Sequence, residues 1–345
     1  MMNRSSIIKS LFTIVLMFGV FTTYSDQRNR CGVCNHRLSE TYWTYNNTVC
    51  CSQDCVDALK PVCSRCGQII GEKYLEAEGR KFCSSSCFEH TLPKCEICKS
   101  AIHSGYSITR RNYCEDCLEK SPTCFSCGFP AAYPSELSDG RITCNACRRW
   151  AVSDMDSALQ HFETARLQLE AWTRLKFSTV PALELVDRTM MEERSGSIRK
   201  SDSPLPVRGL YSRQTYMRKH GIFGAWKHNP ENDRETIYLI DHLHDEAFRI
   251  AATHELMHDL VHEHFPRLED APLWVHEGIC QFAAAQYCLR RNYRDALEGI
   301  ETCSDPDYGD GYRYINNLAG FDGWHALRRW MESVDVASLP KTAPR

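Results

Sequence analysis

The chain has 345 residues, enough for two or more domains, and its formal net charge of −3 gives no general reason to expect nucleic acid or an anionic membrane as a partner. Its cysteine content is unusually high: the chain has twenty cysteines, and seventeen of them lie in the range from Cys31 to Cys147. The composition therefore divides the chain near Trp150. The remainder holds only Cys280, Cys288 and Cys303, which we expect to be buried thiols, or to include one pair if the protein is exported.

The first residues are typical of an export signal. Arg4 and Lys9 precede an apolar run over residues 11–21, and small residues at 23–25 stand where cleavage would occur before Asp26. The run is short for a membrane span. We predict a signal peptide over residues 1–25 and a secreted or periplasmic protein; the alternative is an uncleaved N-terminal membrane anchor.

Residues 26–150 contain a fourfold cysteine repeat. Each unit has a CxxC pair, fifteen or sixteen intervening residues and a second pair, and six or seven residues separate the units. The four sets are Cys31, Cys34, Cys51 and Cys55; Cys63, Cys66, Cys83 and Cys87; Cys95, Cys98, Cys114 and Cys117; and Cys124, Cys127, Cys144 and Cys147.

This spacing predicts four structural zinc sites. A CxxC turn offers two sulfurs to one ion, and a hairpin brings a second pair back to complete a tetrahedron. Units this small need metal binding to fold, although export would favour the alternative of a disulfide framework. Cys50 could replace its neighbour as a ligand, and His36, His90 or His103 could replace a sulfur.

The repeat region has no concentrated basic stripe. Residues 26–150 carry sixteen Lys or Arg and fourteen Asp or Glu, a formal balance of +2. We therefore expect the zinc-ribbon or LIM-like modules to bind substrates or regulatory proteins and not nucleic acid.

The second half predicts one long helix followed by a small sheet. Ser153 with Asp156 resembles a helix-capping box, and Met155, Leu159 and Phe162 begin an apolar stripe at helical spacing that continues to about residue 177. Residues 181–187 and 235–240 are strand-like, and residues 194–206 are typical of a loop.

Residues 254–258, His-Glu-Leu-Met-His, form an HExxH motif after an apolar, helix-like segment over 247–253. On a helix, residues four apart lie about 40° from alignment, so His254 and His258 can bind one metal ion while Glu255 faces the open coordination position. A second helix-like run over 277–289 begins at Glu277, which we predict to be the third ligand.

Two histidines and one glutamate are a standard ligand set for catalytic zinc. The metal lowers the pKa of its bound water, and Glu255 can accept the proton as that water attacks a peptide carbonyl. The motif therefore predicts a zinc peptidase without a covalent intermediate.

Other ligand assignments are less favourable. His264 would need a reversal of the chain at Val261, where a β-branched residue stands in place of glycine, and His262 drifts about 80° from the first histidine of the motif. Glu269 and Asp270 follow Pro266 in a predicted loop.

Four segments resemble a known family. Residues 208–210 (Arg-Gly-Leu), the HExxH motif, residues 277–281 (Glu-Gly-Ile-Cys-Gln) and residues 308–313 (Tyr-Gly-Asp-Gly-Tyr-Arg) occur in the order found in the LIM-domain-containing, ubiquitin-activated peptidases of plant organ-size control, the DA-one type. The resemblance implies a zinc endopeptidase that makes limited cuts in proteins, and we expect a bacterial-type member.

The chain departs from that family in three ways. Its zinc units are six or seven residues apart where a LIM domain has two, no ubiquitin-interacting helix precedes Cys31, and His276 stands where the family typically has Glu. Activation by ubiquitin is therefore not carried over.

Three polar residues are candidates to support the chemistry. Gln281 could hydrogen-bond a metal ligand, and Tyr308 or Tyr312 could donate to the oxyanion, although a structural role is the alternative for each tyrosine.

The expected fold class is α+β. Residues 26–150 form zinc modules, 151–177 a connecting helix and 178–345 a mainly helical gluzincin domain with a small sheet, holding one catalytic and about four structural zinc ions. The alternative function is a non-catalytic zinc-ribbon adaptor with a relic peptidase fold.

Overall fold

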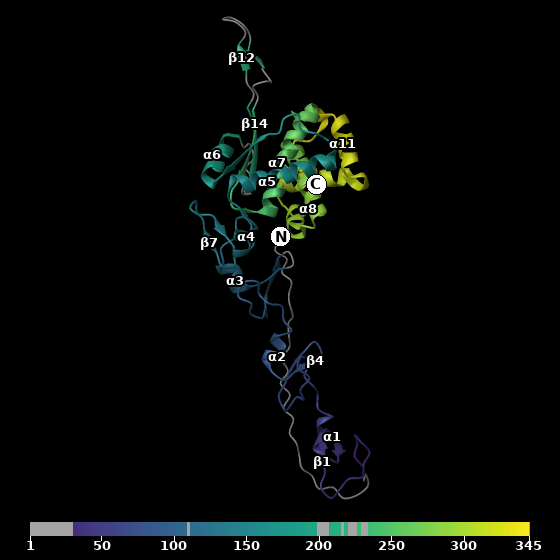
Figure 1. The fold of residues 1–345 in the computed structure, drawn as a ribbon. Coiled ribbons are helices and arrows are strands. Elements are labelled where there is room, and N and C mark those ends of the chain that lie inside the picture. Colours follow the sequence, from purple (N-terminus) through teal and green to yellow (C-terminus); the bar gives the residue numbers. More distant parts are fainter. Residues whose placement is uncertain are drawn as a thin grey trace. The chain divides into compact units, whose positions relative to one another are not determined.

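The computed structural model describes residues 30–108, 111–198, 207–214, 217–219, 226–228 and 234–344. Within these ranges the chain is α+β, with eleven α-helices and several small sheets (Figure 1). It divides into two compact units, one before Ser121 and one from Ser121 onward. The predicted signal peptide lies outside the described residues, and no described helix is long and apolar enough to cross a membrane.

The unit before Ser121 contains the first three cysteine repeats, which share one design. In each repeat the first cysteine pair precedes a two-stranded antiparallel hairpin, and the second pair lies at or within a short helix that follows it. The elements are β1 (Trp43–Tyr45), β2 (Thr48–Cys50) and α1 (Gln53–Asp57); β3 (Leu75–Ala77), β4 (Arg80–Phe82) and α2 (Ser85–Glu89); and β5 (Gly105–Ile108), β6 (Arg111–Cys114) and α3 (Glu115–Lys120).

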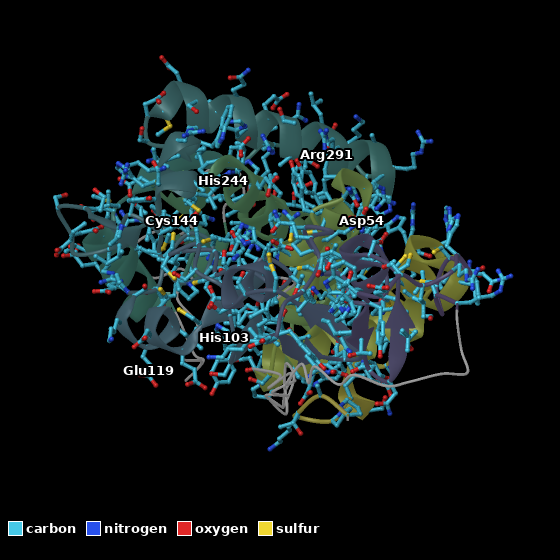
Figure 2. The ribbon with its side chains drawn as sticks, turned by 90° about the horizontal axis from the view of Figure 1, so that it is seen from below. Asp54, His103, Glu119, Cys144, His244 and Arg291 are labelled. Atoms are coloured by element: carbon cyan, nitrogen blue, oxygen red, sulfur yellow. The ribbon has the colours of Figure 1, made fainter. Side chains whose placement is uncertain are left out.

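The fourth repeat belongs to the second unit. It has the same order of elements, β7 (Ser135–Glu136), β8 (Ile142–Thr143) and α4 (Asn145–Arg149). Its Arg141 side chain is almost fully buried and contacts both Asp139 and the Asp241 carboxylate, and it donates to the Asp241 carbonyl at 2.7 Å. Ser126 Oγ accepts from the His244 N–H at 2.8 Å, and Figure 2 labels His244 and Cys144 in this part of the molecule. The fourth repeat is thus packed onto the segment that leads into the HExxH helix.

A three-stranded sheet supports that segment. Its order is β10 (Ala182–Val186), β14 (Arg234–Ile240) and β11 (Gly209–Gln214), with β10 parallel and β11 antiparallel to the central β14. The predicted strands at 181–187 and 235–240 are therefore confirmed. After the turn at His242, β15 (Leu243–His244) pairs with β9 (Ala151–Val152) and leads directly into α7 (Asp245–His264).

Helix α7 packs between α5 (Met155–Thr173) and α8 (Leu273–Arg291) (Figure 1). The predicted long helix exists, but its cap is Asp154 and not Ser153, because the Asp154 carboxylate accepts from the Ser157 N–H at 2.8 Å. The prediction of the apolar face is wrong at the start of the helix, because Met155 and Leu159 are exposed. The residues of α5 that enter the core are Ala158, Phe162, Ala165 and Leu169.

The remaining elements complete the second unit. Helix α6 (Arg188–Ile198) covers the beginning of the predicted loop at 194–206, so that part of the prediction is wrong, and the rest of the loop lies outside the described residues. The others are β12 (Met217–Lys219), β13 (Trp226–His228), α9 (Arg294–Glu301), the π-helical turn η3 (Pro306–Asp310), α10 (Gly311–Ala319), α11 (Trp324–Ser333), and the 3-10 turns η2 (Pro266–Leu268), η4 (Gly320–Asp322) and η5 (Val336–Ser338).

Candidate metal centre

The two motif histidines lie near the middle of α7 on its buried side. Their ring centroids are 5.0 Å apart with an interplanar angle of 72°, and His254 is only 8% exposed. The helix continues unbroken through Val261 to His264, which is the geometry that the spacing requires for both imidazoles to share one ion.

Glu277 meets both histidines from α8. Its Oε2 atom is 3.1 Å from His254 Nε2 and 3.8 Å from His258 Nε2. Ligand atoms about 2.0–2.1 Å from a tetrahedral zinc ion stand roughly 3.3 Å from one another, so these donors fit a single ion. Helix α8 begins at Leu273, one turn earlier than predicted, and this places Glu277 inside the helix with only 8% exposure.

Cys280 is a further donor that the sequence did not point to as a ligand. Its sulfur and the ligand nitrogens of His254 and His258 all lie within 4.8 Å of one another, and its side chain is fully buried. Because Cys280 follows Glu277 by three residues on α8, the two side chains share one helix face. The site therefore offers a choice of third ligand, and we prefer Glu277 because its oxygen lies within 3.8 Å of both ring nitrogens.

Glu255 is held against strand β11. The Tyr211 backbone N–H donates to its carboxylate, and a β-carbon added to Gly209 would stand 2.6 Å from Glu255 Oε1. Burial raises the pKa of Glu255 to about 7, with the Glu277 charge adding to the rise and His254 opposing it. A carboxyl with a pKa near neutrality can exchange a proton in either direction.

The electrostatics of the ligands also suit a cation. Burial lowers the pKa of His258 to about 3, which keeps this imidazole neutral and able to bind metal. Burial acts against ionisation of Glu277 as well, but its hydrogen bond with His254 and its electrostatic interactions with both histidines outweigh burial and lower its pKa.

The candidate supporting residues fall in different places. Tyr308 stacks on His254, with ring centroids 6.0 Å apart, and its hydroxyl bonds to Glu277. Tyr312 is buried, and burial raises its pKa to about 12, with further contributions from the neighbouring Glu301 and Cys288. Gln281 is half-buried and makes no hydrogen bond with His254, His258 or Glu277, all of which the structure describes.

A close helix crossing brings Tyr308 to the side chains of His254 and Glu277. A β-carbon on Gly278 would stand 2.6 Å from the backbone of Gly311, and one on Gly311 would stand 2.5 Å from the Trp274 carbonyl oxygen. Helices α8 and α10 can approach this closely only because both positions lack a side chain. Turn η3, which carries Tyr308, immediately precedes α10.

Sequence reasoning also missed a Tyr–Asp pair beside His258, in which the aspartate is buried and the tyrosine half-buried. The Tyr211 hydroxyl donates to Asp259 Oδ1 at 2.8 Å, and the Tyr211 ring stacks on His258 with a centroid distance of 6.3 Å and an angle of 10°. Asp259 is fully buried, and burial raises its pKa to about 7. No sequence pattern signals this pair, because its two residues come from a strand and a helix that meet only in the fold.

The residues that we set aside as ligands are bonded elsewhere, exposed, or one turn beyond His258 on α7, and His262 and Glu269 line a cavity beside His258. The His264 ring bonds to the Lys176 carbonyl at 2.8 Å, and Glu269 and Asp270 are exposed after η2. His262 is half-buried, one turn beyond His258.

Each of the four cysteine sets can hold a metal ion. Within each set the four sulfurs lie within 4.8 Å of one another, and all twenty cysteines of the chain, every one in a described range, are free thiols. The predicted capacity for four metal sites is thereby confirmed. Cys51 belongs to the first set, whereas Cys50 packs in a small core of that module.

The three histidines near the sets make other contacts. His36 Nδ1 lies 3.3 Å from Cys34 Sγ, His90 Nδ1 bonds to the Ser86 carbonyl, and His103 pairs with Glu89.

Comparison with models of known protein families finds no match, and comparison with curated proteins finds none either.

Proposed function

We propose that the protein is a zinc-dependent endopeptidase that makes limited cuts in other proteins. The observation that carries this proposal is the meeting of His254, His258 and Glu277 beside a buried Glu255 whose pKa is about 7. The donor set is the one that catalytic zinc takes in peptidases, and the glutamate beside the first histidine stands where a general base is needed.

In this proposal some residues bind the metal ion and Glu255 transfers protons. When bound by the two histidines and Glu277, zinc supplies a Lewis acid that activates water and polarises the peptide carbonyl. Glu255 takes the proton from the attacking water and can pass it to the leaving amine. Tyr308 orients Glu277 through its hydroxyl and lies beside His254, on the side of the cluster formed by η3.

The sheet favours an extended peptide as the substrate. Among the described strands, β11 lies at the edge of the three-stranded sheet, and it is the strand that contacts Glu255. An edge strand can pair its backbone groups with an extended peptide chain, which would lay that chain along the side of the sheet where Glu255 is held. The resemblance to the plant organ-size peptidases supports the same class of substrate.

We further propose that the four cysteine sets hold structural zinc and that the modules bind substrate or regulatory proteins. Four thiolates in a tetrahedral arrangement are a common structural zinc site. The near balance of charge over residues 26–150 gives no support to nucleic-acid binding. Export by the N-terminal segment, or anchoring by it if uncleaved, remains a prediction.

The Glu255→Gln variant tests the catalytic part of the proposal. Glutamine keeps the size of the side chain but cannot accept the proton, so we expect unchanged metal content and a loss of turnover of about 10²–10⁴-fold. The assay is mass-spectrometric detection of new termini in a mixture of unfolded proteins. Equal proteolysis by the wild type and the variant would refute the assignment of Glu255.

Metal analysis separates the peptidase from the adaptor alternative. A zinc endopeptidase with four structural sites binds five ions per chain, whereas an adaptor with a relic peptidase fold binds four. His254→Ala provides the matched control, because it should remove only the fifth ion.

A further inference from the structure

A cavity of about 180 Å³ opens beside the candidate metal centre. Its walls come from strand β11, helix α7, turn η2 and the first turns of α8. One wall is His258 and another is Tyr211, which stacks on that histidine. The cavity therefore shares His258 with the candidate metal centre.

The lining is mainly apolar at depth. Val261 and Phe265 are 2% and 4% exposed, and Leu268 is fully buried. The polar side chains of His262, His276 and the exposed Glu269, together with Pro266, complete the lining. A pocket with an apolar floor and a few polar groups gains free energy mainly by removing an apolar group from water.

The volume sets the size of the occupant. A cavity of roughly 150 Å³ lined by aliphatic and aromatic side chains holds one benzene molecule, whereas sites for drug-sized ligands span about 300–1,000 Å³. The cavity thus has room for one large side chain and is smaller than the sites that usually hold drug-sized ligands.

We propose that this cavity is a specificity pocket for a large apolar side chain, aromatic or long aliphatic, on a residue of the substrate next to the bond that is cut. The inference rests on the proposed endopeptidase function and names its substrate class. Tyr211 connects the two sites, because its ring lines the pocket while its N–H holds Glu255. A side chain in the pocket therefore places its own backbone close to the catalytic groups.

Two substitutions at Val261 change the pocket in opposite directions. Val261→Phe places a ring in the cavity, and Val261→Ala enlarges it. Val152→Ala is the matched control, because Val152 is equally buried but lies on β9 outside the pocket. All variants are made in the full chain with bound metal, and thermal unfolding and metal content verify folding.

The first experiment compares cleavage sites in a library of peptides of known sequence. One methylene group in an apolar pocket changes specificity by about 10–200-fold, so the wild type should favour Phe or Leu over Ala at one flanking position by at least about tenfold. Val261→Phe should reverse this preference, and Val152→Ala should keep it. The pocket assignment is wrong if the wild type cuts without a flanking preference, or if neither Val261 variant alters the preference.

The second experiment does not depend on turnover. N-acetyl-phenylalaninamide and N-acetyl-alaninamide are titrated into the Glu255→Gln protein and followed by ligand-observed NMR. We expect at least tenfold tighter binding of the phenylalanine probe and its loss when Val261→Phe is added. Selective probe binding without any peptide cleavage would support the pocket and overturn the endopeptidase function; equal affinity for the two probes would overturn the pocket.

Discussion

Gly209 offers a direct test of how strand β11 positions Glu255, the proposed catalytic base. In Gly209→Ala the new methyl carbon would stand 2.6 Å from Glu255 Oε1 and 2.9 Å from Leu239 Cδ2. Ordinary contact begins at 3.4 Å, so the carboxylate must move by about 0.8 Å. A displacement near 1 Å in an active site can reduce the rate by about 10²-fold. We expect a loss of this order in turnover, with the metal content unchanged because the ligands lie on α7 and α8.

The matched control for this substitution is Gly299→Ala. Gly299 lies on α9, and a β-carbon there would meet nothing within 4 Å. Alanine should stabilise the helix by about 0.5–1 kcal/mol and leave turnover unchanged. The assays are peptide cleavage and metal analysis on the same preparations. If Gly209→Ala retains turnover within a factor of about three of the wild type, β11 does not set the position of Glu255 and the reasoning fails.

Three further predictions follow from the site. Glu277→Gln should lower the metal occupancy of the candidate site by about tenfold or more, whereas Cys280→Ser should leave it unchanged, as measured by metal analysis during dialysis against a chelator. If Cys280→Ser loses the metal and Glu277→Gln keeps it, Cys280 is the third ligand. Glu255 must be deprotonated and has a pKa of about 7 without a cation, and a bound cation lowers that pKa further. The value of kcat/KM should therefore rise with pH along a limb whose midpoint lies at or below about pH 7; a midpoint above pH 8 would contradict this. Burial raises the pKa of Asp259 from 3.8 to about 7, so ionisation of this carboxyl destabilises the folded state increasingly as the pH rises from about 4 to 7. The Asp259→Asn variant removes this charge. Its free energy of unfolding, measured with denaturant, should exceed that of the wild type by on the order of 2–4 kcal/mol at pH 8 and should show no gain at pH 4.

The sequence predicted the parts of the site that depend on local spacing. Two histidines four residues apart on a helix must share a face, so α7 could be predicted from residues 247–258 alone. The approach of Glu277 from a second helix was also expected, although α8 begins four residues earlier than the sequence indicated.

The contacts of β11 with α7 could not be predicted in this way. Gly209 and Tyr211 are far from Glu255 and Asp259 in the sequence, and only the pairing of β11 with β14 brings them together. Propensity also failed at helix ends, where the choice of Asp154 over its neighbour Ser153 depends on the exact path of the chain after β9.

The attachment of the fourth cysteine repeat to the second unit has a consequence for biogenesis. Arg141 is almost completely enclosed by contacts with Asp139 and Asp241, so the repeat and the approach to α7 share one buried ion network. During synthesis the repeat leaves the ribosome before the helix that bears the histidines. If the fourth cysteine set binds its metal at that stage, the repeat is folded before the later helices pack against it. The yield of folded protein should then depend on the metal available during translation.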